Sequence, residues 1–157
     1  MSVVDFLTTR EVPFDVIEHQ PTYDAQRMAE AVHTPGQEVA KTVLVRADSG
    51  FAYVVVVVPA DRQVDLDKVR VALGGGHVEL ASEKEVAERC PDCECGALPP
   101  FGSLYGLKTI VDQSLAADDQ IVFEGNTHSQ AIRMAFADFR DAEQPLICHL
   151  VRQPVGS

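Results

Sequence analysis

Alternating apolar and polar residues divide the chain into short strands joined by turns. The clearest signal is a pair of β-branched runs, residues 39–47 and 51–59, separated by Asp48-Ser49-Gly50. This arrangement predicts a β-hairpin, and the five consecutive valines of its second arm predict a strand buried on both faces. Shorter apolar or alternating runs predict strands at residues 12–17, 107–112, 120–124, 130–136 and 146–151.

Helix caps and helical spacing predict short helices between these strands. Asp65 is suited to cap a helix that ends at Gly74-Gly75-Gly76. Ser82 and Glu85 have the spacing of a capping box for a helix that runs to about Arg89. Further helices are predicted at residues 2–10, 24–32 and 137–140. Residues 90–103 contain three prolines and two glycines, which predicts a loop.

The order of these elements is irregular, and no unit is repeated. Such an order predicts a mixed α/β (α+β) fold and argues against a doubly wound parallel sheet, in which strands and helices alternate regularly. A chain of 157 residues can bury one core, and no stretch has the composition of a linker. We therefore expect residues 1–157 to form a single domain.

The chain carries 13 basic and 24 acidic residues, a formal net charge of -11. Extended DNA binding depends on many lysine and arginine contacts to phosphates, so this charge argues against a DNA-binding protein. It does not exclude contact with one end of a nucleic acid, and residues 41–80 hold equal numbers of bases and acids. The apolar run 51–60 is too short to cross a membrane, and the N-terminus lacks a secretion-signal pattern, so we expect a cytoplasmic location.

Cys90, Cys93 and Cys95 have a spacing that resembles half of a zinc site. Structural zinc usually takes four ligands from two closely spaced pairs, and the remaining cysteine, Cys148, stands apart in an apolar run. Without a secretion signal, four cysteines are more typical of reduced thiols than of disulfides. We predict no metal and no cofactor, and we keep a zinc-stabilised structural protein as an alternative.

Three polar segments lie between apolar runs, and each has two interpretations. Lys41 either extends into solvent or lies in a cleft where it holds a phosphate. Residues 96–102, Gly-Ala-Leu-Pro-Pro-Phe-Gly, form either a rigid turn or a platform that presents backbone dipoles to a ligand. His128, in the turn 125–129, is either a solvent-facing residue or part of a site.

Together these segments resemble the YbaK-like, prolyl-tRNA-synthetase-associated editing domains. The resemblance rests on Ala40-Lys41-Thr42, the stretch 92–102 with its Gly-x-x-x-Pro element, and Gly125-x-x-His128, and it extends over residues 5–151. It implies a compact fold with a curved or barrel-like sheet around an aminoacyl pocket. It also implies a metal-free hydrolase that cleaves the ester of mischarged aminoacyl-tRNA. Its partners would be the acceptor end of that tRNA and, as a second candidate, an aminoacyl-tRNA synthetase.

The resemblance also implies roles for individual residues. Lys41 is expected to hold the tRNA end, the loop 96–100 to cradle the aminoacyl group, and His128 to shape the pocket. The implied catalytic residues are Lys41, Gly96 and His128. The implied substrate contacts are Tyr23, Ala97, Pro99, Pro100, Asn126 and Thr127.

The amino acid removed by such an enzyme is suggested by a departure from the family pattern. Many members carry a glycine where this chain has Asn126-Thr127. The polar groups of Thr127, His128 and Ser129 can bond a hydroxylated side chain, which favours Ser or Thr, then Ala, over Cys. The alternative is a module of the same fold that binds an aminoacyl group or nucleotide without turnover.

Overall fold

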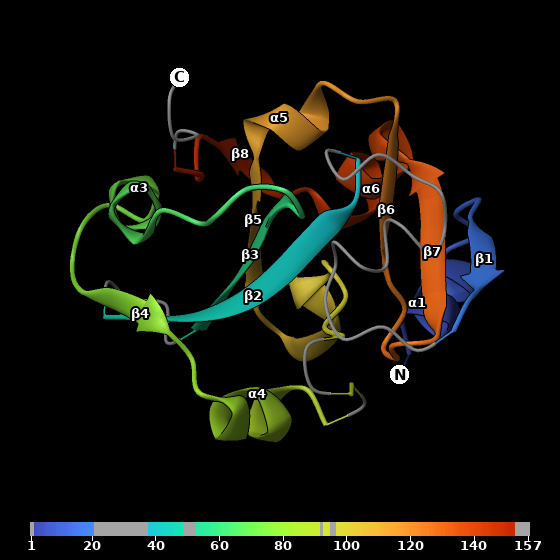
Figure 1. Ribbon diagram of the computed structural model, residues 1–157, viewed down its shortest axis with the longest axis horizontal. Coiled ribbons are helices and arrows are strands. Elements are labelled where there is room, and N and C mark those ends of the chain that lie inside the picture. Colours follow the sequence, from blue (N-terminus) through green and yellow to red (C-terminus); the bar gives the residue numbers. More distant parts are fainter. Residues whose placement is uncertain (1, 21–37, 49–52, 92, 95–96, 153–157) are drawn as a thin grey trace.

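The computed structural model describes residues 2–20, 38–48, 53–91, 93–94 and 97–152, and its strands form two sheets (Figure 1). The predicted helix 24–32, the turn of the hairpin, Tyr23 and Gly96 lie outside these residues. The smaller sheet has the order β1 (Asp15–Glu18), β7 (Gln130–Ala135), β6 (Gln120–Glu124). The larger sheet has the order β4 (Val78–Leu80), β2 (Ala40–Ala47), β3 (Tyr53–Pro59), β5 (Lys108–Asp112), β8 (Leu146–Cys148).

Strands β2 and β3 pair as the predicted hairpin, with Val43 opposite Val56 in an antiparallel register. β3 pairs with β5, and β5 with β8, in parallel, so the larger sheet is mixed. An isolated parallel bridge between Val39 and Val122 connects the two sheets. The mixed α/β class is confirmed. The described strands form two facing sheets and do not close into a barrel.

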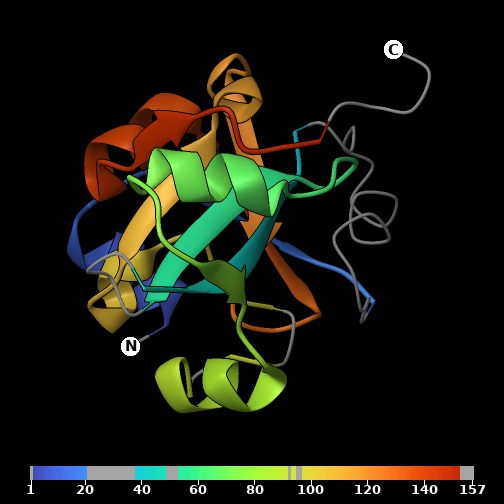
Figure 2. The ribbon, with the colours of Figure 1, turned by 90° about the vertical axis from the view of Figure 1, so that its left-hand side faces the viewer.

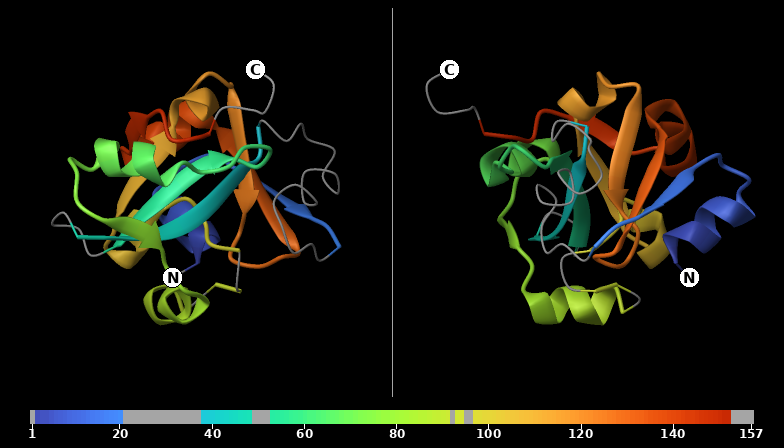
Figure 3. Two further views of the ribbon diagram at one scale, coloured as in Figure 1. Left: turned by 60° about the vertical axis from the view of Figure 1, so that its left-hand side comes forward. Right: turned by 45° about the vertical axis from the view of Figure 1, so that its right-hand side comes forward.

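The valine run of β3 is buried on both faces, as predicted. Val55 and Val57 face a core cluster shared with the smaller sheet, α1 (Val3–Thr9) and α6 (Phe136–Glu143) (Figure 3). The intervening valines face a second cluster under α3 (Leu66–Ala72), which lies across that side of the sheet (Figure 2). Because both faces are covered, each valine contributes about 1.5–3 kcal/mol through burial.

The helix ends carry the caps that the sequence predicts. Asp65 accepts hydrogen bonds from the N–H groups of Asp67 and Lys68 at the start of α3, and the three glycines after this helix have positive φ angles. At α4 (Glu83–Arg89), Ser82 and Glu85 form both bonds of a capping box. Among the described helices, none is long and apolar enough to cross a membrane.

Several short elements differ from the sequence prediction. Phe136 begins α6 instead of ending β7, because its ring packs with that of Phe139 at 5.6 Å in the core. The strand expected at 146–151 ends at Cys148, and the chain then pairs through Val151 with Val64. β4, α5 (Gln113–Ala116) and the 3-10 helix η1 (Gly102–Tyr105) have no counterpart in the prediction, because so few residues show no periodic pattern.

Candidate functional site

The loop between α4 and η1 contains the Gly-x-x-x-Pro element, whose described residues 97–100, which include Ala97, Pro99 and Pro100, are buried together with Phe101. The Phe101 ring lies 5.3 Å from that of Phe6, and two edge contacts bring it 5.7 Å from Phe123 and 5.2 Å from Phe139. Two prolines restrict the backbone next to Phe101, so residues 97–101 are anchored in the core.

The exit of this loop is held by a hydrogen-bond network. The Gly102 N–H donates to the Thr109 hydroxyl at 2.8 Å, and that hydroxyl donates to Glu143 at 2.6 Å. Glu143 also accepts from the Ser103 N–H at 3.1 Å. Burial raises the pKa of Glu143, and these hydrogen bonds oppose the shift. A Cβ at position 102 would lie 2.6 Å from the Thr109 hydroxyl oxygen, so the position requires glycine.

Asn126, in the turn between β6 and β7, connects three separate segments. Its φ of 73° is left-handed, a conformation that asparagine adopts more readily than most residues. Its side-chain carbonyl accepts from the Val3 N–H at 2.9 Å, at the start of α1. Its amide donates to the Cys93 sulfur and the Tyr105 hydroxyl, each at 3.3 Å. The side chain therefore holds the turn against α1 and the loop.

Glu94 joins the loop directly to the same turn. Its N–H donates to the Asn126 carbonyl at 2.8 Å, and its carboxylate accepts from the His128 N–H at 3.1 Å. The His128 ring is buried, with Nδ1 3.1 Å from the carboxylate of the buried Glu124. The solvent-facing interpretation of His128 is therefore wrong. The Thr127 hydroxyl lies beside it, 3.4 Å from the hydroxyl of Ser129.

Lys41 lies on β2, close to the bridge that connects the two sheets. Its ammonium group is half-buried and donates to the Arg62 carbonyl at 2.8 Å. Burial lowers the pKa of Lys41, and the negative charge of Asp61 opposes this shift. An ammonium group has three N–H donors, so Lys41 keeps donors for a ligand in a partly desolvated position.

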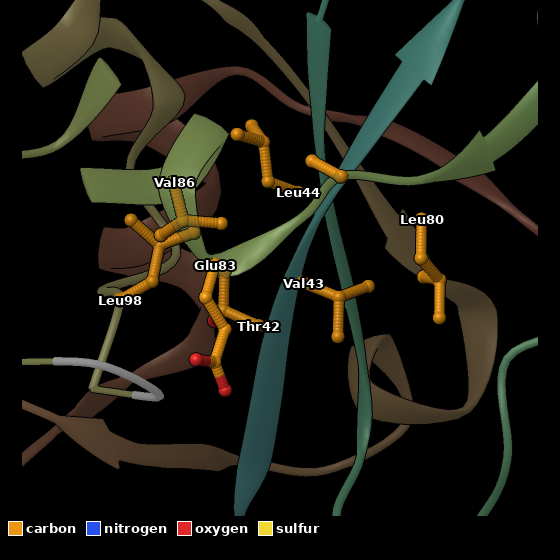
Figure 4. Close-up of a pocket in the computed structure, with 8 residues that line it drawn as sticks. Thr42, Val43, Leu44, Leu80, Glu83, Val86 and Leu98 are labelled. Carbon is orange, nitrogen blue, oxygen red and sulfur yellow. The ribbon is translucent and has the colours of Figure 1, made fainter. Parts of the chain in front are cut away.

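A pocket of about 250 Å³ lies between β2 and the loop (Figure 4). Its lining comes from β2, β4, α4 and the loop and comprises Thr42, Val43, Leu44, Leu80, Ala81, Glu83, Val86 and Leu98. Among the described residues, β4 pairs with β2 from Val45 to Ala47 and leaves the edge beside Thr42 open. The Leu44 carbonyl accepts from the Ala81 N–H on this side, so the alternate residue Thr42 directs its own N–H and C=O toward the same open edge.

Thr42 also carries a hydroxyl group without a partner. Its Oγ1 is buried and makes no hydrogen bond to any residue in the described part of the chain. An unsatisfied buried hydroxyl costs about 1–3 kcal/mol, so a ligand that bonds to it recovers free energy. The sequence does not reveal this role of the Thr42 hydroxyl, because a β-branched threonine is an ordinary residue for a strand.

The loop and the β6–β7 turn are thus in direct contact, and Ala40 of β2 belongs to the same core cluster as Leu98 of the loop and Phe123 of β6. The hydrogen bond of the Lys41 ammonium is made elsewhere, to the segment that follows β3. Two predicted site residues, Tyr23 and Gly96, lie outside the described residues.

Cys90 and Cys93 pack as small side chains, and Cys95 lies outside the described residues. Cys90 is a buried free thiol, and burial raises its pKa to about 12. The Cys93 sulfur lies 3.0 Å from the Tyr105 hydroxyl. Within residues 2–20, 38–48, 53–91, 93–94 and 97–152, no three His, Cys, Asp or Glu side chains are grouped so as to hold a metal ion.

The fold places the chain in a class of small mixed α/β domains with known structures. A crystal structure of a hypothetical protein matches 96% of the chain with a TM-score of 0.86 and 19% identity, and the match covers 99% of that protein. The crystal structure of a proposed trans-editing enzyme for prolyl-tRNA synthetase also matches 96% of the chain, with a TM-score of 0.84 and 21% identity, over 95% of its own length.

The sequence then identifies the family. Residues 19–142 match the profile of the aminoacyl-tRNA editing domain, so the chain belongs to this family, as the motifs predict. It is 22% identical over 141 residues to the prolyl-tRNA editing protein ProX of Acetoanaerobium sticklandii. That match covers 87% of the chain and 85% of ProX. It is 30% identical over 128 residues to the proline–tRNA ligase of Bacillus cytotoxicus. That match covers 72% of the chain, which spans 22% of the ligase.

Proposed function

We propose that this protein is an aminoacyl-tRNA deacylase that acts in trans on mischarged tRNA. The observation that carries the proposal is the pocket between the Lys41 strand and the Gly-x-x-x-Pro loop, in a chain of the aminoacyl-tRNA editing family. The pocket has mostly apolar walls suited to a small side chain, and the open edge of β2 offers backbone groups to an aminoacyl moiety. An aminoacyl ester is already activated, so positioning and fixed dipoles can supply most of the rate without a metal.

Lys41, the loop and His128 have separate roles in this proposal. The half-buried ammonium of Lys41 binds a phosphate at the 3′ end of the tRNA, which supplies the counter-charge that its partly desolvated position favours. The loop, with Gly96 at the start of its Gly-x-x-x-Pro element, orients the ester and the attacking water through its backbone. The buried His128 shapes the turn beside the loop. Tyr23 is kept as a candidate at the mouth of the pocket.

For the substrate, we favour Ser or Thr, then Ala, over Cys. The buried hydroxyl of Thr42, which has no hydrogen-bond partner among the described residues, supports this preference, because a hydroxylated substrate can bond to it. A Thr42→Val variant keeps the shape and removes the hydroxyl. It should lose about threefold to tenfold in kcat/KM for the Ser or Thr ester, the value of one neutral hydrogen bond, and little for the Ala ester. Equal losses for all three esters would remove Thr42 from the specificity site.

The direct test is a panel of tRNAs mischarged with Ala, Ser, Thr or Cys, with loss of the ester followed over time. We expect hydrolysis above the uncatalysed rate, and Lys41→Ala should reduce it about tenfold or more while the circular dichroism spectrum is unchanged. Lys84→Ala, at an exposed position on α4, is the matched control and should remain fully active. If no ester in the panel is hydrolysed, the deacylase proposal fails, and binding of a non-hydrolysable aminoacyl-adenosine analogue would then favour the binding module.

The proposed activity also has a location and a partner. Mischarged tRNA arises where aminoacyl-tRNA is made, so we propose that the protein works in the cytoplasm. Because its relatives include a proline–tRNA ligase, a prolyl-tRNA synthetase is the candidate protein partner.

A further inference from the structure

Basic side chains gather beside Lys41, where the segment after β3 meets the end of the described chain. An antiparallel bridge between Val64 and Val151, flanked by main-chain hydrogen bonds on both sides, joins these two segments. The last described residues therefore run alongside α3 (Figure 2). The side chains gathered there, called the basic ridge below, are Arg62, Lys68, His149 and Arg152.

The basic ridge is continuous with Lys41 through hydrogen bonds. Lys41 donates to the Arg62 carbonyl at 2.8 Å, and the Arg62 guanidinium donates to the Arg152 carbonyl at 3.1 Å. The Lys68 ammonium donates to the Val151 carbonyl and to Nε2 of His149, both at 2.8 Å. These bonds hold the side chains of Lys41, Arg62 and Lys68 in place with neutral acceptors, so the bonds themselves do not cancel the positive charges.

Carboxylates gather around Asp61 at the Lys41 end of this surface, where burial and the charges of Glu38, Asp119 and Asp61 raise the pKa of Asp118. No carboxylate in the described residues forms an ion pair with Arg62, Lys68 or Arg152. The acidic side chains of the same segments lie as follows: Asp65 caps α3, Asp61 acts on Lys41, Asp67 is exposed on α3, and the buried Asp112 lies 4.0 Å from Nδ1 of His149. By contrast, Arg46, which lies on β2 like Lys41, forms ion pairs with Glu79 and Glu85.

We propose that the basic ridge binds two or three backbone phosphates of the acceptor end of tRNA, beyond the phosphate proposed for Lys41. The inference rests on the proposed function for the position of the RNA end. A chain with a net charge of -11 repels RNA over most of its surface, so RNA approaches where fixed cations lack acidic partners. The ridge meets this condition, and its contact with Lys41 makes it the continuation of the RNA backbone beyond the pocket.

The test measures binding of a fluorescent, uncharged tRNA(Pro) transcript by anisotropy across a series of salt concentrations. The double variant Lys68→Gln/Arg152→Gln is compared with Lys84→Gln/Arg140→Gln, which removes the same charge from exposed positions on α4 and α6. Each lost phosphate contact should weaken binding about fivefold to eightfold at 0.1 M salt and reduce the salt slope by about one unit. The ridge variant should therefore bind about 25-fold to 60-fold more weakly. The control variant should bind like wild type.

Two results would overturn the proposal: an equal loss in both double variants, which indicates net charge alone, or no loss in the ridge variant. Lys68 also holds the Val151 carbonyl, so the single variant Arg152→Gln serves as a second test. Its side chain is exposed and makes no hydrogen bond or ion pair with the described residues, and its loss should still reduce the slope by about one unit.

A separate hydrolysis assay tests the proposed function. An aminoacyl ester of adenosine carries no phosphate, so ridge variants should hydrolyse it at the wild-type rate. A slower rate would mean that these substitutions disturb the pocket and would contradict a role limited to the RNA backbone. A wild-type protein that binds tRNA through the ridge but cleaves no ester would support the ridge and refute the deacylase.

Discussion

Replacement of Phe101 by alanine should remove the anchor of the Gly-x-x-x-Pro loop. The ring is fully buried and lies within 5.2–5.7 Å of three other phenylalanine rings, measured between centroids. Truncation of a buried phenylalanine costs about 3–5 kcal/mol, and edge-to-face ring pairs add to burial. Because three ring contacts are lost together, we expect the upper part of this range, about 4–5 kcal/mol.

The loss can be measured by urea unfolding followed by far-UV circular dichroism, since the chain contains no tryptophan as a fluorescent reporter. A loss of about 4–5 kcal/mol is a large part of the 5–15 kcal/mol typical of a domain, and it lowers the melting temperature by about 8–20 °C at this chain length. Val71→Ala is the matched control. Val71 is 72% exposed on α3, so its truncation should change stability by less than about 0.5 kcal/mol.

The conservative variant Phe101→Leu distinguishes the stability that comes from buried apolar volume from the stability that comes from ring–ring contacts. Leucine retains most of the buried apolar surface, so we expect a loss of about 1–2 kcal/mol. A loss below about 2 kcal/mol for Phe101→Ala would refute the reasoning, because residues 97–101 would then be anchored by contacts other than those of this ring.

Two further predictions concern the networks at the ends of the loop. Burial raises the pKa of Glu143 in the folded state, so its contribution to stability is complete below the ordinary glutamate pKa of about 4.3 and is lost as the pH rises through the raised value. Thermal melts between pH 4 and 7 should show this loss in the wild type and its absence in Glu143→Gln. At Asn126, Gly should be tolerated better than Ala by about 1 kcal/mol in urea unfolding, because φ is 73° and both variants lose the same side-chain bonds.

The parts of the fold that could be predicted are those in which one local pattern decides the structure. The valine run predicts a strand buried on both faces, and Ser82 with Glu85 predicts the start of a helix, because caps and β-branched runs act over a few residues. Phe136 shows the limit. It continues the alternation of β7, yet it begins α6 because its ring packs with that of Phe139 in the core, a tertiary contact that outweighs the local pattern.

The site could be predicted as a set of segments, but not as a set of contacts. The turn 125–129 is readable from its composition, whereas Asn126 owes its role to Val3, which lies 123 positions away in the chain. His128 is buried because Glu94 and Glu124 meet it from a loop and a strand. Thr42 illustrates the same point, since only the end of the β4 pairing leaves its edge open. Partners that are distant in sequence have no local signal.

The positions of the basic side chains change what the net charge of -11 implies for RNA binding. Arg46 is neutralised by Glu79 on β4 and Glu85 on α4 and adds little to RNA binding, whereas Arg62, Lys68 and Arg152 form no ion pair within the described residues. About three to four phosphate contacts give a salt slope of about -2 to -3.5, far shallower than that of an extended nucleic-acid-binding surface. Such a protein gains little affinity from the body of the tRNA. Its selectivity must therefore come from the aminoacyl end or from a synthetase that delivers the tRNA.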